Sequence, residues 1–174
     1  LPDDTIDIAI RFGDLPDSRL VARKIADNRR LLVASPAYLR GAALPAHPQD
    51  LHQHQCIVLR QNDVAYGNWR LSRGRQTETI KVRGKLSTND GEVALNWALD
   101  GHGILMRAEW DVAKYLRSGR LVQVLADYDT PPADIHAVYA ERLNLSAKVS
   151  AFVEHLRSYL GHHADGPDPG RAKW

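Results

Sequence analysis

The sequence predicts an α/β protein built on a largely parallel sheet. From Leu31 to Leu160, short apolar runs of strand length alternate with segments that carry helix caps and apolar stripes, an order typical of α/β folds. Ahead of them, residues 5–12 alternate between apolar and polar side chains, which is the period of a strand. A chain of 174 residues with 44% apolar and 25% charged residues has room for one domain or a pair of small lobes.

The first strand is predicted over residues 5–12, and the turn-forming residues 13–18 end it. Because side chains alternate across a strand, Ile10 and Phe12 fall together on its apolar face. We expect that face to be buried, in a strand near the centre of its sheet. Phe152, Val153 and Leu156 of the last helix are expected to cover it.

The remaining strands are short and mostly apolar. They are predicted over residues 20–25, 31–34, 56–59, 85–87, 104–106, 121–125 and 135–140, with a hairpin that joins residues 69–71 to 77–82. The hairpin turn is expected at Arg73-Gly74-Arg75, since a central glycine is typical of such turns. Residues 42–55 are rich in Pro, His and Gln and predict a surface loop with one helical turn.

Four helices are predicted from the signals at their ends. Ser35, followed by a proline, is a typical N-cap for a short helix over residues 37–40. Asn89 stands three residues before Glu92, a capping-box spacing that predicts the start of a mostly buried helix. The other two helices are predicted over residues 109–117 and from Ser146 to Gly161, with a flexible tail over residues 162–174.

Several classes of protein are excluded by simple counts. No apolar run approaches the roughly 18 residues that a membrane helix requires. The single cysteine, Cys56, cannot form an internal disulfide, which favours a reducing compartment. The first residues, Leu1-Pro2-Asp3-Asp4, have none of the features of a signal peptide. We therefore expect a cytoplasmic protein, and a chain that is the middle of a longer one.

The charges are nearly balanced, with 23 Lys and Arg against 21 Asp and Glu. The basic residues are scattered along the chain, with only short pairs such as Arg29-Arg30. No dense phosphate-binding stripe is visible, so the sequence does not predict contact between this segment and DNA.

The common catalytic signatures are absent, including the nucleophile elbow, the phosphate-binding loop and the zinc-protease helix. Gly101-His102-Gly103 is followed by an apolar run in place of a third glycine, which indicates a helix end and a tight turn. Cys56 is interpreted as a small buried apolar residue in preference to a nucleophile. We expect no catalysed reaction and no cofactor.

A metal site was weighed at His52, His54 and Cys56, which alternate along an extended segment. Zinc sites need three or four ligands in a closed geometry, and no further ligand stands at a supporting spacing. Solvated loop histidines are the favoured interpretation, so no metal is expected.

The segment from Ser87 to Gly91 is the best candidate for binding a ligand. It joins a strand to a helix whose first amides have no partner within the helix, and the helix dipole favours an anion there. The alternative is that Asn89 and Glu92 satisfy those amides themselves. Asp90 counts somewhat against a bare anion site, and spacing alone leaves both interpretations open.

Three segments, in order, resemble the effector-binding domain of LysR-type transcriptional regulators. They are residues 6–18 running into 20–24 and 32–39, which include AIRFG, LPDS and ASPAYL; residues 84–92 with 98–104; and residues 119–122 with 135–139 and 146–153. The order and spacing of these segments over residues 6–160 carry the resemblance.

The resemblance implies two Rossmann-like lobes of the type 2 periplasmic-binding-protein class, with lobe I incomplete. Residues 1–28 and 137–161 would form lobe I, and residues 29–136 would form lobe II. It implies a ligand-sensing domain of a bacterial transcription factor, whose homo-oligomeric parent, a dimer or tetramer, contacts DNA only through an N-terminal domain absent here. The alternatives are a solute-binding receptor of a transport system and an enzyme on the same fold.

The resemblance also places a small effector between the lobes. The expected contacts are Phe12 and Gly13 from lobe I, with Ser35, Thr88, Asn89 and Asp90 from lobe II. Two helix N-termini, after Ser35 and Asn89, would favour a carboxylate on the effector.

Overall fold

A computed structural model describes residues 7–13, 15, 19–60, 67–143 and 146–164, with the side chains of residues 161–164 left out. The chain forms two compact units: residues 1–28 with 132–173 make unit 1, and residues 29–131 make unit 2. The predicted division into lobes, with its second boundary after residue 136, stays a prediction.

Unit 2 is an α/β unit with a five-stranded sheet in the order β7-β4-β8-β3-β9. Its strands are β3 (Arg30–Ala34), β4 (Cys56–Leu59), β5 (Asn68–Arg73), β6 (Gln76–Lys81), β7 (Ser87–Thr88), β8 (Ile104–Ala108) and β9 (Val122–Gln123). Its helices are α1 (Pro36–Arg40), the 3₁₀ helix η1 (Pro48–Gln53), α2 (Gly91–Leu99) and α3 (Glu109–Ser118). Strands β7, β4 and β8 run parallel, whereas β3 runs antiparallel to β8 and to β9.

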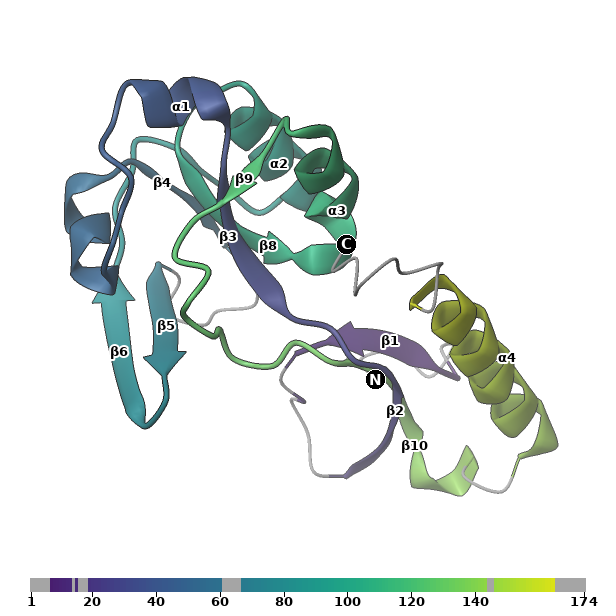
Figure 1. Ribbon diagram of the computed structural model, residues 1–174. Helices are drawn as coiled ribbons and strands as arrows, with labels where there is room; N and C mark the ends of the chain where they lie inside the picture. The colour runs from purple at the N-terminus through teal and green to yellow at the C-terminus, as the bar shows by residue number, and fades with distance from the viewer. Residues whose placement is uncertain (1–6, 14, 16–18, 61–66, 144–145, 165–174) are drawn as a thin grey trace. The chain divides into compact units, whose positions relative to one another are not determined.

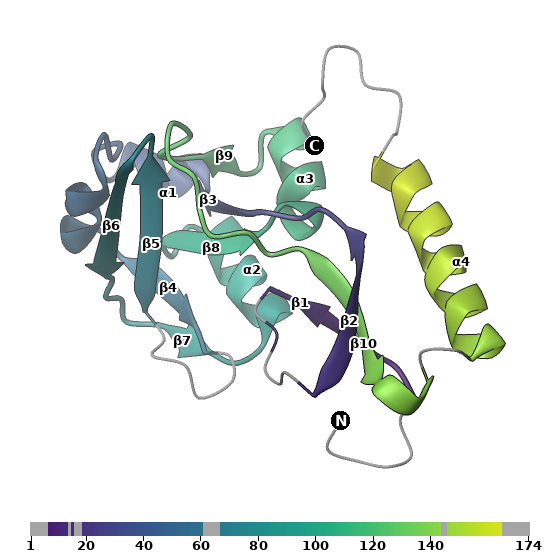
Figure 2. The ribbon, with the colours of Figure 1, turned by 90° about the horizontal axis from the view of Figure 1, so that it is seen from below.

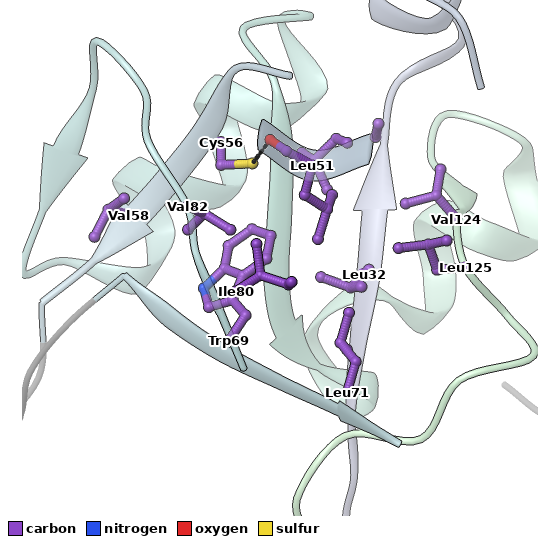
Figure 3. Close-up of a cluster of buried hydrophobic side chains, with 12 residues drawn as sticks. Leu32, Leu51, Cys56, Val58, Trp69, Leu71, Ile80, Val82, Val124 and Leu125 are labelled. Carbon is purple, nitrogen blue, oxygen red and sulfur yellow. Dashed lines mark hydrogen bonds between the residues drawn. The ribbon is translucent and has the colours of Figure 1, made fainter. Parts of the chain in front are cut away.

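Both faces of this sheet are buried, because alternate side chains of each strand enter different hydrophobic clusters. On β3, Leu31 and Val33 belong to one cluster, called the first cluster below. Leu32 and Ala34 belong to a second cluster on the other face of the sheet. Helices α2 and α3 cover the first cluster. Hairpin β5–β6 and η1 cover the second, where Trp69, with other hairpin side chains, packs over the sheet (Figure 3).

Unit 1 is smaller and holds a three-stranded antiparallel sheet in the order β1-β10-β2. Its elements are β1 (Ala9–Phe12), β2 (Leu20–Ala26), β10 (Ile135–Ala140), the 3₁₀ helix η2 (Glu141–Leu143) and α4 (Ala147–Ala164). The central strand β10 is the most buried, with Tyr139 fully enclosed. Helix α4 packs on β2, where the guanidinium of Arg157 donates two hydrogen bonds of 2.9 Å to the carbonyl of Lys24.

The fold class and most elements are confirmed, but the details of β1 are wrong in the sequence prediction. Strand β1 is an edge strand, and Ile10 and Phe12 are 40% and 56% exposed. Phe152 is 45% exposed, whereas its neighbour Val153 is buried. The alternation correctly gave the strand, but it carries no information on which face other elements cover.

Two further expectations need correction. The sheet of unit 2 is mixed and not largely parallel, because β3 enters it in the reverse direction. Helix α4 continues past Gly161 to Ala164. Residues 162–164, which were predicted to belong to a flexible tail, are therefore helical. Residues 165–174 lie outside the described residues.

A matched pair of leucines tests the packing of the hairpin on the sheet. Leu71 is fully buried and Leu44 is 65% exposed. We expect Leu71→Ala to lower the free energy of unfolding by about 2–5 kcal/mol, because it removes apolar contacts and leaves a cavity. Leu44→Ala should change it by no more than about 0.5 kcal/mol. Urea denaturation measures both, and equal effects would contradict this placement of the hairpin.

Candidate functional site

The site candidate lies at one end of the unit 2 sheet. The parallel strands β4, β7 and β8 all have their carboxyl ends there, with Thr88 opposite Leu59. Ligands of open α/β sheets bind at the carboxyl ends of the strands. After Thr88 the chain passes through Asn89 and Asp90 into α2 (Figure 2).

The connection from β7 to α2 is held by its own side chains. The hydroxyl oxygen of Thr88 accepts a hydrogen bond from the backbone N–H of Asp90 at 3.0 Å. The carboxylate of Asp90 accepts two more, from the N–H groups of Glu92 at 2.8 Å and Val93 at 3.2 Å. The N-cap of α2 is therefore Asp90 and not Asn89 as the capping-box spacing suggested, while Asn89 is exposed beside it.

Arg107, which the sequence analysis did not single out, reaches this helix start from β8. A Cβ on Gly91 would lie 2.3 Å from both terminal guanidinium nitrogens of Arg107, so the guanidinium lies against the glycine. One of those nitrogens pairs with the carboxylate of Asp111 at 3.1 Å. The Nε of Arg107 is buried and has no hydrogen-bond partner among the described residues. The sequence signal that could have indicated this contact is Gly91, a glycine at the first position of a helix that follows a strand.

A second arginine, Arg29, forms an ion pair at the same end of the sheet. The guanidinium of Arg29 donates to both carboxylate oxygens of Glu109, at 2.7 and 3.0 Å. The backbone N–H of Glu109 also donates to the carbonyl of Arg29 at 2.9 Å. Hydrogen bonding to Glu109 raises the pKa of Arg29 above its ordinary value. The side chain of Glu109 is 10% exposed, so this bidentate pair holds the start of β3 against the start of α3.

Ser35 does not lie with Thr88. It follows the carboxyl end of β3, and because β3 is antiparallel to β8, that end is at the opposite edge of the sheet from the end of β7. Ser35 is 2% exposed, and its hydroxyl oxygen accepts a hydrogen bond from the N–H of Tyr38 at 3.1 Å, as the predicted cap of α1. Its role as an effector contact stays a prediction on which the proposal below does not depend.

Phe12 and Gly13 belong to unit 1, at the carboxyl end of the edge strand β1. The ring of Phe12 is largely exposed. Gly13 has a φ of +80°, which favours glycine, and its N–H donates to the carbonyl of Asp134 at 3.1 Å. These contacts hold the end of β1 beside β10.

Of the three residues weighed as a metal site, His52 is exposed, whereas His54 and Cys56 are buried. His54 is therefore not the solvated loop histidine that the sequence analysis favoured. Among the described residues, no group of three or more His, Cys, Asp or Glu side chains is arranged to hold a metal ion. The Nδ1 of His54 lies 2.8 Å from the hydroxyl oxygen of Tyr38. Cys56 is 1% exposed, and burial raises the pKa of its thiol to about 12. The interpretation of Cys56 as a buried apolar residue is confirmed.

Comparison with known proteins identifies the family. Residues 1–161 match the family model of the LysR substrate binding domain. The chain belongs to this family. Two relatives of this LysR domain are from Escherichia coli (strain K12). The HTH-type transcriptional activator TtdR is 41% identical over 170 residues, and the HTH-type transcriptional regulator DmlR is 44% identical over 163 residues.

The alignments cover 98% and 94% of this LysR domain, and 54% and 53% of TtdR and DmlR. The chain thus spans about half the length of these relatives. The family is a domain of transcriptional regulators, which are not a class of enzymes. Across the described residues, no helix combines the length and apolar character needed to cross a membrane.

Solved structures agree with the family. The CrgA regulatory domain of Neisseria meningitidis has a TM-score of 0.76 at 28% identity, over 90% of this chain and 76% of that one. Full-length AphB of Vibrio cholerae has a TM-score of 0.75 at 32% identity, over 91% of this chain and 54% of that one. The periplasmic-binding-protein-like fold class expected from the resemblance is confirmed.

The start of α2 offers a direct comparison of two neighbouring side chains. Asp90→Ala should lower the free energy of unfolding by about 0.5–2 kcal/mol, because two helix amides lose their acceptor. Asn89→Ala should leave stability nearly unchanged, since Asn89 does not cap the helix. Chemical denaturation of both variants decides this, and a larger loss for Asn89→Ala would restore Asn89 as the cap.

The thiol of Cys56 provides a second test. Burial and a pKa of about 12 keep the reactive thiolate rare at neutral pH. We expect an aromatic disulfide reagent to react with the folded chain far more slowly than with the chain in concentrated urea. Equal rates in the two conditions would show that Cys56 is accessible.

Proposed function

We propose that this LysR domain senses a small, carboxylate-bearing effector. In unit 2 the effector contacts Thr88, Asn89 and Arg107, with Asp90 holding the loop in shape. Effector contacts by Phe12 and Gly13 of unit 1 stay a prediction of the sequence analysis, on which this unit 2 site does not depend. The observation that carries the proposal is the guanidinium of Arg107, which lies against Gly91 at the start of α2 with its Nε unpartnered among the described residues.

The chemistry of these groups favours an anion with hydroxyl or amide neighbours. Asp90 already satisfies the amides of Glu92 and Val93, so the helix start by itself has little capacity left for an anion. The positive charge comes from Arg107, whose planar guanidinium matches a carboxylate. The hydroxyl of Thr88 accepts from the N–H of Asp90 and keeps its own proton to donate. Asn89 is exposed and adds an amide.

Regulation would follow by a shift of population between two states of the domain. An effector changes an equilibrium only by the difference between its affinities for the two states. We propose that this shift passes, in a cytoplasmic homo-oligomeric parent, to a DNA-binding part that lies outside this chain, and that no reaction is catalysed. The transport-receptor alternative is not favoured, because the relatives TtdR and DmlR are transcriptional regulators.

Two threonines of unit 2 test the site. A panel of small mono- and dicarboxylates is titrated by calorimetry against the unmodified chain, Thr88→Val and Thr79→Val. For a carboxylate that binds, Thr88→Val should weaken affinity about tenfold, the equivalent of one lost hydrogen bond of ~1.4 kcal/mol. Thr79→Val, an exposed control on β6, should leave affinity unchanged. An unchanged affinity in Thr88→Val would remove Thr88 from the site.

A further inference from the structure

Hairpin β5–β6 concentrates positive charge that is scattered in the sequence. Residues 67–85 contain six basic side chains and one acidic side chain, whereas the whole chain has a net charge of only +2. All six basic residues are exposed: Arg70, Arg73, Arg75, Lys81, Arg83 and Lys85. The acidic residue, Glu78, is partly buried and accepts a hydrogen bond from Gln49 at 3.0 Å.

The two faces of the hairpin differ in composition, although Arg73 and Glu78 share the inner face with the apolar residues. Trp69, Leu71 and Ile80 point into the hydrophobic cluster beneath it. Because side chains alternate across strands, the opposite face carries Arg70 and Lys81 among small polar residues, namely Asn68, Ser72, Thr77 and Thr79. This outer face lies on the side of the unit 2 sheet away from α2 and α3 (Figure 2).

Much of this charge is not neutralised within the protein. The side chains of Arg70, Arg75 and Arg83 form no ion pair or hydrogen bond with any described residue, and Arg73 lies over the ring of Tyr128, 4.9 Å from its centroid. At the edge of β5, the backbone of Asp129 pairs with that of Ser72. The charge is available to an outside partner.

The composition of the face favours a phosphate backbone over a protein partner. The outer-face residues include no aromatic or large apolar side chain, whereas protein interfaces depend on such anchors. Arginines interspersed with hydroxyl and amide donors are the groups that contact phosphate oxygens in nucleic acids. Strands of six residues extend about 20 Å at ~3.3 Å per residue, the axial length of roughly six base pairs at ~3.4 Å each.

We propose that the outer face of hairpin β5–β6, with Arg83 beyond it, binds the phosphate backbone of double-stranded DNA without reading its sequence. This contact adds a second, electrostatic attachment beside any sequence-specific DNA-binding part of the parent. It requires no effector, so it stands apart from the site at the start of α2. The sequence analysis did not predict it, because the charges come from separate places: Arg70 and Lys81 on the outer face, Arg75 in the turn and Arg83 after β6. They form no continuous basic run in the sequence.

The test measures binding of a labelled duplex of arbitrary sequence, about 30 base pairs long, by fluorescence anisotropy from about 20 to 200 mM salt. The unmodified chain should bind at low salt, with a logarithmic affinity that falls linearly with the logarithm of salt concentration. The variant Arg70→Gln/Arg75→Gln/Arg83→Gln should lose about tenfold or more in affinity at low salt, and its salt slope should be shallower by roughly three.

A matched variant controls for net charge. Arg40→Gln/Arg117→Gln/Lys148→Gln removes three exposed charges elsewhere, whose side chains also form no ion pair with a described residue. This control variant should keep nearly all of the DNA affinity of the unmodified chain and nearly the same dependence of affinity on salt. Both variants should melt like the unmodified chain, since neither set of side chains forms a hydrogen bond or ion pair with a described residue.

Three results would overturn the proposal. The first is absence of binding by the unmodified chain at the lowest salt. The second is an equal loss in the two triple variants, which would reflect net charge alone. The third is equal or tighter binding of poly-glutamate of matched length through the same three arginines, which would assign the face to an acidic protein.

Discussion

Strand β3 contributes side chains to two hydrophobic clusters, one on each face of the unit 2 sheet. The arrangement of unit 2 depends on this double burial. Leu31 and Val33 require the helices on one face, and Leu32 and Ala34 require the hairpin on the other. A strand buried on both faces cannot slip by one residue, because a slip exchanges the two sets of side chains. The register of β3 against β8 and β9 is therefore closely defined. This register in turn positions the strand ends, and the helix starts that follow them, at both ends of the sheet.

The direction of β3 then separates two groups that look alike in the sequence. Ser35 and Asp90 both follow a strand and both cap a helix, but β3 is antiparallel to β8, so they lie at opposite ends of the sheet. At the Thr88 end, Asp90 satisfies the amides of α2 and Arg107 supplies the positive charge. The bidentate pair of Arg29 and Glu109 anchors that same end. The end of the sheet where the guanidinium of Arg107 lies against Gly91, with its Nε unpartnered among the described residues, is the one we propose for an anionic effector.

Local signals predicted most elements well. Caps, prolines and glycines located α1, α3 and the hairpin turn, because these depend on backbone geometry within a few residues. The same local signals carry no information on contacts between segments that are distant in the sequence. The alternation in β1 gave a strand but placed Ile10 and Phe12 on a buried face, and the stripe of α4 placed Phe152 inside; both depend on which neighbours cover the face. The reversal of β3, the approach of Arg107 to Gly91 and the basic hairpin face all arise from contacts between distant segments.

The most direct test of the account maps where a small carboxylate contacts unit 2. The isotope-labelled chain is titrated with the carboxylate panel, and its backbone amide resonances are followed by nuclear magnetic resonance. The account predicts that the largest shifts gather at residues 88–91 and at Arg107, at the carboxyl ends of β7 and β8. Shifts gathered instead around Ser35 and Tyr38, at the other end of the sheet, would contradict it.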